Sequence, residues 1–159
     1  MYEAEHEQIK EVLEKSDVKH NSNLIAIKDD YSHIYKIKEA FKRKELVVMH
    51  GDRFLEGANT IEMTFMNETA EFPTGPLYLA SKNNALVSFV YAIKESSTHY
   101  HFYATKAKHY AYPAKIKTRN EDLKNMLKDY IKSLETIINK YPTQWFNYYP
   151  FWKQELKQL

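Results

Sequence analysis

The chain has 159 residues, the usual length of one domain or of a large piece of one. Its 23 basic and 21 acidic residues give a formal net charge of +2, which supplies little attraction for phosphates, so we expect no nucleic-acid partner. The sequence has no cysteine, which excludes disulfides, thiolate metal sites and cysteine nucleophiles, and its three glycines are too few for a nucleotide-binding glycine loop.

The first 50 residues are predicted to form two helices and two strands. Residues 2–16 carry an apolar stripe among charged side chains, as amphipathic helices do. The short apolar run at residues 23–28 predicts a strand, and residues 29–43 predict a second helix. Residues 45–50 (ELVVMH) form an unbroken apolar run, which predicts a buried strand in a sheet covered on both faces.

The middle of the chain is predicted to be mainly strand. Residues 60–66 alternate between apolar and polar side chains, which predicts a strand with one face in water. Residues 72–76 (FPTGP) predict a turn into a short helix over residues 77–82. Residues 85–94 and 98–106 predict two further strands joined as a hairpin.

The C-terminal third contains the best-marked helix and an aromatic segment. Apolar residues recur every three or four positions over residues 119–140, and Thr118 and Glu121 have the spacing of a capping box. Residues 141–152 hold seven aromatic side chains. The C-terminal arm at residues 141–159 is therefore interpreted as core packing, a lipid-interface belt or a partner site.

The order of these elements favours an α/β fold. Helices and strands alternate along the whole chain, with no internal repeat and no low-complexity linker. We therefore predict a single domain over residues 1–159, built on a mixed, largely parallel sheet flanked by helices.

Two predicted loops carry groups suited to a polar ligand. Asp52 and Arg53 follow a predicted strand, where open α/β sheets place their ligand sites. The pair could hold a phosphate or orient another group, because arginine offers a bidentate fork, and the alternative is a structural ion pair. The turn with Phe72, Thr74 and Gly75 precedes a helix, whose free N–H groups suit an anion or a developing oxyanion.

Two histidines lie two residues apart on one predicted strand. His99 and His101 share a face of that strand and could in principle bind a metal ion. The local sequence offers no acidic residue with matching spacing. We interpret the pair as part of a half-exposed sheet face and expect no metal site.

Five blocks follow one another along the chain: residues 46–53 (LVVMHGDR), a strand ending at 65–66, and residues 72–80 (FPTGPLYLA), 85–90 (ALVSFV) and 141–146 (YPTQWF). This ordered set resembles the bacterial lipid A biosynthesis (late) acyltransferases of the lysophospholipid acyltransferase superfamily. The likeness is to the C-terminal half of such a protein. It implies a truncated domain similar to the second half of a glycerolipid acyltransferase-like domain.

The resemblance implies a function in lipid metabolism. It implies transfer of a fatty acyl chain from acyl carrier protein or acyl-CoA to a hydroxyl of a glycolipid such as a lipid A precursor, with no cofactor. It also implies a peripheral position on the cytoplasmic face of the bacterial inner membrane, with this fragment itself soluble. A sheet lacking its first strands exposes an edge, which favours a homodimer. The alternative is a non-enzymatic α/β module that binds lipid or protein through the aromatic C-terminal segment.

The family's general base is a histidine followed five positions later by aspartate or glutamate, a block that precedes those above. His6 with Glu11 has that spacing, inside a charged helix and closer to Asp52 than the family order implies. The pair is the catalytic candidate, and the chain is otherwise expected to need its missing half. By position, the resemblance implies substrate binding by Asp52, Arg53, Phe72, Thr74, Gly75, Gln144 and Trp145.

Overall fold

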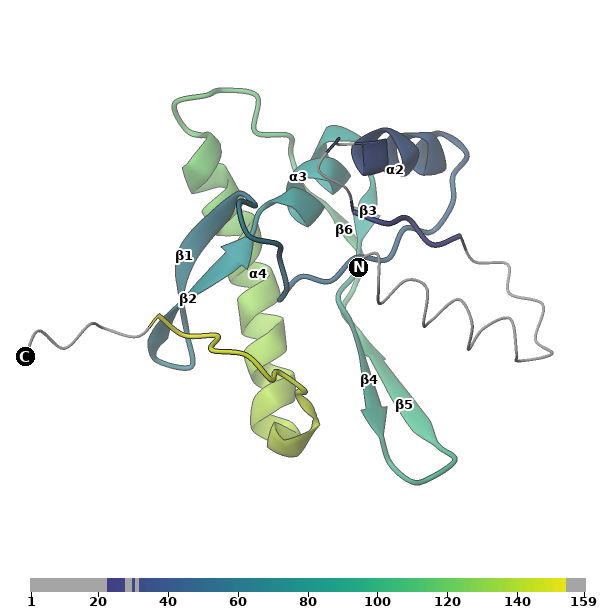
Figure 1. Ribbon diagram of the computed structural model, residues 1–159, viewed down its shortest axis with the longest axis vertical. Coiled ribbons are helices and arrows are strands. Elements are labelled where there is room, and N and C mark those ends of the chain that lie inside the picture. Colours follow the sequence, from purple (N-terminus) through teal and green to yellow (C-terminus); the bar gives the residue numbers. More distant parts are fainter. Residues whose placement is uncertain (1–22, 28–29, 31, 154–159) are drawn as a thin grey trace, which may run out of the picture. The chain divides into compact units, whose positions relative to one another are not determined.

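The computed structural model describes residues 23–27, 30 and 32–153 of the chain (Figure 1). The chain divides into two compact units, Met1–Val48 and Met49–Leu159. The described part of the first unit contains the helix α2 (Ser32–Lys42), which confirms the helix predicted over residues 29–43 with shorter ends. The helix predicted over residues 2–16 lies outside the described residues.

The ends of α2 follow from local hydrogen bonds. The Ser32 amide donates to the Asp30 carboxylate at 2.9 Å, which satisfies one of the free N–H groups at the start of the helix. At the other end Lys44 has a φ of 60°, and the Glu45 amide donates to the Ala40 carbonyl at 3.0 Å. This left-handed ending closes the last turn and stops the helix.

Two of the predicted strands do not form. Residues 23–27 and 45–50 have no strand conformation, so both predictions are wrong. Leu46 is 91% exposed and Val48 is 85% exposed, whereas a buried strand was expected. A strand needs a neighbour for its backbone hydrogen bonds, and no strand in the described part of the chain pairs with either run. An apolar run alone therefore did not specify a strand.

The described part of the second unit contains mixed α/β structure with three small sheets (Figure 1). Its helical elements are α3 (Gly75–Lys82), α4 (Arg119–Lys140) and the 3-10 turn η1 (Pro142–Gln144). The paired strands are β1 (Thr60–Phe65) with β2 (Glu68–Pro73), β3 (Leu86–Val87) with β6 (Lys108–His109), and β4 (Val90–Lys94) with β5 (Tyr100–Ala104). All three pairs are antiparallel, so the prediction of a largely parallel sheet is wrong, although the mixed α/β class is confirmed.

The turn between β1 and β2 explains this difference. Met66 and Asn67 have φ values of 52° and 69°, as the two central residues of a tight hairpin turn require. The turn sends the chain straight back beside β1, whereas a parallel pair needs a long crossover connection. The strand predicted over residues 60–66 is thus confirmed. Its partner β2 was missed, since residues 67–71 were assigned no element and residues 72–76 were interpreted as a turn.

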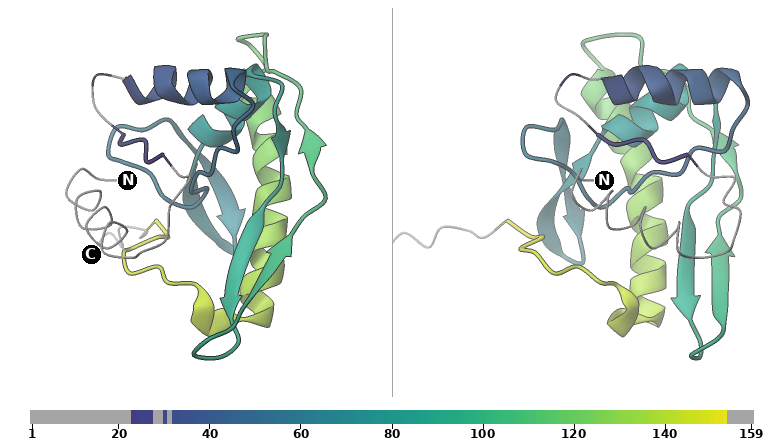
Figure 2. Two further views of the ribbon diagram at one scale, coloured as in Figure 1. Left: turned by 90° about the vertical axis from the view of Figure 1, so that its right-hand side faces the viewer. Right: turned by 45° about the vertical axis from the view of Figure 1, so that its right-hand side comes forward.

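The helix α4 organises the core of the second unit. Its bounds agree with the prediction for residues 119–140, and it runs between the β1–β2 and β4–β5 hairpins (Figures 1 and 2). The predicted capping box does not form, because the Thr118 hydroxyl donates to Asp122 at 3.1 Å. The buried apolar stripe of the helix consists of Leu123, Met126, Leu127, Ile131, Leu134 and Ile138.

The hairpin predicted from residues 85–94 and 98–106 is confirmed with one interruption. The first predicted strand is split into β3 and β4, whereas the second contains β5 alone, with β6 beyond it. At the break the Ser88 hydroxyl donates to the Thr105 carbonyl at 2.7 Å, and the Phe89 amide donates to the Thr105 hydroxyl at 2.9 Å. Over the described ranges, no helix combines the length and the apolar composition needed to cross a bilayer.

Candidate functional site

A loop and the C-terminal arm meet around Asp52. The Trp145 indole donates to Asp52 Oδ2 at 3.1 Å, and the Tyr149 hydroxyl donates to the Asp52 carbonyl at 2.6 Å. Arg53 lies beside it, with 3.6 Å between Arg53 Nε and Asp52 Oδ1, and donates to the Phe146 carbonyl at 3.2 Å. The structure thus joins three predicted site residues, Asp52, Arg53 and Trp145. With Phe146 and Tyr149, these residues form a group of five that we call the Asp52 cluster.

The cluster holds its carboxylate in a defined place. The Asp52 side chain is 14% exposed, whereas the Arg53 side chain is 51% exposed. A carboxylate with a fixed indole donor and a neighbouring guanidinium is oriented before any ligand arrives. The exposed guanidinium remains accessible to an anionic group.

Ring packing holds the C-terminal arm at this site. Trp145 lies edge-on to the buried Phe65 with 5.4 Å between ring centroids, and Phe151 lies 5.5 Å from the same ring. The Trp152 indole donates to the Phe65 carbonyl at 3.2 Å, and Trp152 forms an isolated antiparallel bridge with Ala70 on β2. The inner aromatic residues of the arm are therefore core, as one of the interpretations of this segment expected.

Tyrosines from α4 and β4 lie close to Asp52. A Cβ atom on Gly51 would lie 2.7 Å from Tyr130 Cζ, so the ring of Tyr130 occupies space that only glycine leaves free. Burial raises the pKa of Tyr130, and the negative charge of Asp52 acts in the same direction. Burial also raises the pKa of Tyr91, and the nearby Ser133 hydroxyl partly offsets this rise. Among the described residues, no group meets hydrogen-bond geometry with the buried Tyr91 hydroxyl. Both phenols thus stay protonated at neutral pH.

These tyrosines were not singled out by sequence reasoning. Tyr130 falls on the apolar stripe of α4 and was counted as a core residue. Tyr91 is one of thirteen tyrosines and no local spacing distinguishes it, whereas Tyr149 was considered only as part of the aromatic segment at residues 141–152. Only the folded chain brings them near Asp52.

The other predicted substrate-binding residues have different surroundings. Phe72 is fully buried and packs on Phe65 and Tyr130, at 5.6 and 6.1 Å between ring centroids, so it lies in the core. Gln144 bonds both its amide oxygen and its amide nitrogen to the Lys94 backbone, at 2.7 and 2.9 Å. Gln144 therefore takes up the backbone hydrogen bonds on the outer edge of β4 at Lys94.

The turn before α3 is tied to the loop that precedes β1. The Thr74 amide and hydroxyl both donate to the Asn59 carbonyl, at 3.0 and 3.1 Å. A Cβ atom on Gly75 would meet no atom within 4 Å, so the backbone there is open to its surroundings. The Thr74 side chain makes no cap to the helix. Substrate binding by Thr74 and Gly75 stays a prediction.

The catalytic candidate pair and the strand histidines have separate outcomes. His6 and Glu11 lie outside the described residues, so their pairing stays a prediction. Glu95 reaches both strand histidines, at 3.4 Å from His99 Nε2 and 3.5 Å from His101 Nδ1, which corrects the expectation of no matching acid. Among the residues that the structure describes, no group of three or more histidine, cysteine, aspartate or glutamate side chains is placed to hold a metal ion.

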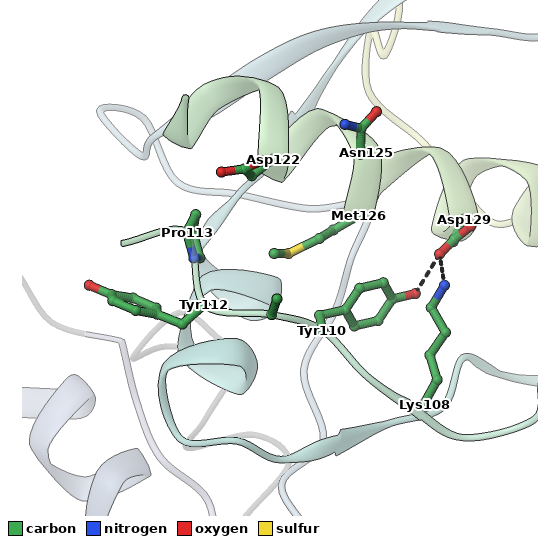
Figure 3. Close-up of a pocket in the computed structure, with 9 residues that line it drawn as sticks. Lys108, Tyr110, Tyr112, Pro113, Asp122, Asn125, Met126 and Asp129 are labelled. Carbon is green, nitrogen blue, oxygen red and sulfur yellow. Dashed lines mark hydrogen bonds and ion pairs between the residues drawn. The ribbon is translucent and has the colours of Figure 1, made fainter. Parts of the chain in front are cut away.

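A pocket of about 330 Å³ lies at a different place, beside the first half of α4 (Figure 3). Lys108 and residues 110–113 form one wall, and the other wall comes from α4. The Tyr110 hydroxyl donates to Asp129 Oδ2 at 3.0 Å, and Lys108 pairs with the same oxygen. None of the Asp52 cluster residues lines this pocket. The unit thus has two distinct polar regions.

Comparison with known proteins identifies the family. A family model described as bacterial lipid A biosynthesis acyltransferase matches residues 1–154. No curated protein matches the chain significantly. The match covers nearly the whole sequence, including the Asp52 loop and the aromatic residues of the segment 141–152. The chain therefore belongs to the bacterial lipid A biosynthesis acyltransferase family.

Proposed function

We propose that this protein transfers a fatty acyl chain to a hydroxyl of a glycolipid such as a lipid A precursor, and that the Asp52 cluster binds the acceptor. The donor in this proposal is acyl carrier protein or acyl-CoA. The observation that carries the acceptor site is the oriented, mostly buried Asp52 carboxylate beside an exposed Arg53 guanidinium. Such a pair can accept a hydrogen bond from a hydroxyl and bind a phosphate on one molecule.

The chemistry assigns a role to each group. The acceptor oxygen loses its proton to a general base and attacks the thioester carbon, and the carbon–sulfur bond then breaks as the thiolate leaves. His6, oriented by Glu11, is the proposed base. Arg53 holds an anionic group of the acceptor. The turn at Thr74 and Gly75, with Phe72 in the core below, is proposed to shape the acyl-binding side.

The exposed part of the arm supports a membrane-facing role. Tyr148 is 88% exposed, and Phe146 and Tyr149 are also exposed beside it. Aromatic side chains of this kind favour the boundary between water and lipid. We propose that they contact the cytoplasmic face of the bacterial inner membrane and so bring the Asp52 cluster to its lipid substrates.

The predicted homodimer through a sheet edge is also a proposal. The outer edge of β4 is occupied at Lys94 by the Gln144 amide. An added strand would therefore pair more readily along the outer edge of β5, where no strand pairs in the described part of the chain. Light scattering of the purified chain tests this directly.

The test of the main proposal measures acceptor binding and acyl transfer separately. Labelled acyl carrier protein and a lipid A precursor in micelles are supplied to the unaltered chain, Asp52→Asn, Arg53→Gln and His6→Ala. We expect the first two variants to weaken acceptor binding and transfer, and His6→Ala to abolish transfer while acceptor binding persists. Arg43→Gln, which alters an exposed arginine of the first unit, is the matched control.

Two outcomes would contradict the proposal. Equal acceptor binding by Asp52→Asn, Arg53→Gln and the unaltered chain would remove the Asp52 cluster as acceptor site. Absence of transfer by the unaltered chain would contradict catalysis by these 159 residues. The truncated-domain interpretation predicts that transfer then appears only in a form extended upstream by a histidine–acid block.

A non-enzymatic lipid-binding module is the second candidate, favoured by the exposed aromatic residues of the arm. It predicts vesicle binding that is lost in Phe146→Ser and Tyr148→Ser but kept in Asp52→Asn. Trp145 and Trp152 are unsuitable for this test, because both pack against Phe65 and their loss would disturb the fold. Acyl transfer that falls in Asp52→Asn would decide against this candidate.

A further inference from the structure

Two phenols meet between strand β5 and the C-terminal end of α4, where the β4–β5 hairpin runs beside that helix (Figure 2). Tyr103 lies in β5, and Tyr141 directly follows the last residue of α4. Their hydroxyl oxygens are 2.6 Å apart, and their ring centroids are 5.8 Å apart at an interplanar angle of 43°. Two rings that met end to end through this hydroxyl contact would have more distant centroids. The rings therefore lie side by side, with the edges next to the hydroxyls adjoining.

Both phenols are held in place by their surroundings. Tyr103 belongs to a paired strand, and its ring stacks on His101 with 4.4 Å between centroids. The Tyr141 amide donates to the Ile137 carbonyl at 2.8 Å, and the Tyr141 carbonyl accepts from the Gln144 amide at 3.0 Å. Both tyrosine side chains are also partly exposed, so a small reagent can reach them. The pair is thus preorganised and accessible.

Lys140 completes a chain of hydrogen bonds at this pair. Its ammonium donates to the Tyr103 oxygen at 3.3 Å. An ammonium cannot accept, so this contact leaves the Tyr103 proton available for donation to Tyr141. The hydrogen bond from Tyr103 lowers the pKa of Tyr141, Lys140 acts in the same direction, and the charge of Glu95 opposes them. Tyr141 therefore ionises more readily than an ordinary tyrosine, and an ionised phenol loses an electron more readily than a neutral one.

A second tyrosine pair provides a comparison within the same unit. The hydroxyls of Tyr78 and Tyr112 are 3.1 Å apart, and their ring centroids are 5.7 Å apart at an interplanar angle of 57°. The hydrogen bond with Tyr78 raises the pKa of Tyr112, and burial acts in the same direction. This pair thus has a longer hydroxyl contact and more steeply crossed rings. Its ionisation is opposed, whereas that of Tyr141 is favoured.

We propose that Tyr103 and Tyr141 form a site of oxidative modification, at which a one-electron oxidant derived from a peroxide couples the two rings into dityrosine. Each phenol loses one electron and its hydroxyl proton. The two radicals join through a carbon–carbon bond between ring carbons ortho to the hydroxyls, and the hydrogens on those carbons move to the phenol oxygens. The two electrons break the O–O bond of the peroxide, and the two protons pass to water. Because the rings already lie side by side, coupling requires no encounter between distant parts of the chain.

The new bond would tie the β4–β5 hairpin to the end of α4. It joins residues that are 38 positions apart, so it constrains the unfolded chain as a disulfide does. The linked chain should therefore resist unfolding more than the unlinked chain. Formation of the link requires no acyl transfer, so the inference is independent of the proposed function.

The test oxidises the purified 159-residue chain at low concentration with tris(bipyridyl)ruthenium, persulfate and a short flash of light. Persulfate is the peroxide, and it accepts two electrons to give two sulfate ions. Size exclusion isolates the monomeric product and so removes links between copies, and mass spectrometry identifies the linked peptides. We expect the Tyr103–Tyr141 link to be more abundant than the Tyr78–Tyr112 link. The linked chain is expected to unfold at a higher urea concentration.

Phenylalanine variants provide matched controls, because they keep the ring and remove only the hydroxyl. Tyr103→Phe and Tyr141→Phe are each expected to lose this link completely. Tyr148→Phe changes an 88% exposed tyrosine of the arm and is expected to leave the yield of the link unchanged. The chain unfolded in urea before oxidation is expected to lose the preference for this pair, since its tyrosines meet at random.

Exposure alone would favour reaction at Tyr148, whereas the geometry favours the paired phenols. Four results would overturn the proposal: no Tyr103–Tyr141 link in the folded chain, a larger yield of the Tyr78–Tyr112 link, the same pattern of links in the unfolded chain, or loss of the link in Tyr148→Phe. An unchanged urea midpoint of the linked chain would contradict its role in tying the hairpin to α4.

Discussion

Two aspartates of the second unit are held by similar groups in different surroundings. Each accepts a hydrogen bond from an aromatic side chain and lies beside a cation: Trp145 and Arg53 for Asp52, Tyr110 and Lys108 for Asp129. The Asp52 side chain is 14% exposed, whereas that of Asp129 is 44% exposed and lines a pocket. The buried arrangement joins distant segments, and the exposed one joins a helix to the segment just before it.

The two arrangements also differ in the sequence separation of the residues that form them. The hydrogen bond between Asp52 and Trp145 spans 93 residues, and the bond between Asp129 and Tyr110 spans 19. The first depends on the whole packing of the arm against Phe65. We therefore expect changes around Asp52 to affect stability more than equivalent changes around Asp129.

The largest expected effect is that of Phe65→Ala. Phe65 is fully buried and contacts four other aromatic rings, including Trp145 and Trp152 of the arm. Its removal should lower the free energy of unfolding by about 3–5 kcal/mol, because a large cavity remains. Urea unfolding measures the change, with Ile116→Ala, at a position 81% exposed, as the control. A loss below about 1 kcal/mol would mean that the arm does not depend on this ring.

The next effect isolates the donor to each aspartate. Trp145→Phe keeps a ring but removes the N–H that bonds to Asp52, and should cost about 1.5–3 kcal/mol, the range for a hydrogen bond to a charged group. Tyr110→Phe removes the donor to the more exposed Asp129 and should cost about 0.5–1.5 kcal/mol. Chemical denaturation of both variants compares them. Equal losses would show that burial does not separate the two regions.

Gly51→Ala tests the packing beside Asp52. The added methyl would lie 2.7 Å from Tyr130 Cζ, so the ring or the loop must move. Overpacking of this kind costs about 1–3 kcal/mol, and the displaced loop should also reduce acceptor binding at Asp52. Gly75→Ala is the control, because its methyl would meet no atom within 4 Å. Similar stability of the two variants would contradict the close packing of Tyr130.

The elements predicted correctly are those whose hydrogen bonds are local. The helix over residues 119–140 agreed at both ends, because an α-helix bonds within itself and its apolar spacing is visible along the chain. The hairpin strand at residues 60–66 has an alternating pattern and a partner two residues away. Residues 45–50 had the more apolar pattern, but no strand among the described residues pairs with them. Their prediction required pairing that no local pattern contains.

The candidate site shows the same limit. Asp52 and Arg53 were found from a local motif, because a carboxylate and a guanidinium after an apolar run are visible in the sequence. That Trp145 would bond to Asp52, or that Tyr130 would fill the space beside Gly51, depends on contacts across most of the unit. Gln144 illustrates the opposite case. Its place in the block at residues 141–146 that resembles the family indicated substrate binding, whereas its amide forms hydrogen bonds with the Lys94 backbone at the edge of β4.

A smaller effect concerns the ionisation of Tyr110, which donates a hydrogen bond to Asp129. Burial raises the pKa of Tyr110 above its ordinary value of 10.0, and its hydrogen bond to Asp129 acts in the same direction. Above about pH 10 the unfolded chain releases this proton while the folded chain keeps it, so stability should fall as pH rises. Thermal unfolding across this range should show a shallower fall for Tyr110→Phe. An unchanged slope would mean that Tyr110 ionises equally in both states.

The smallest expected effect is that of Lys108→Met, which removes the cation beside Asp129 and keeps most of the side chain's length. Both partners are about half exposed, so the ion pair should contribute about 0–1 kcal/mol to stability. Urea denaturation of this variant measures the change. A loss well above about 1 kcal/mol would make Asp129 a structural residue like Asp52, and the difference between the two regions would disappear.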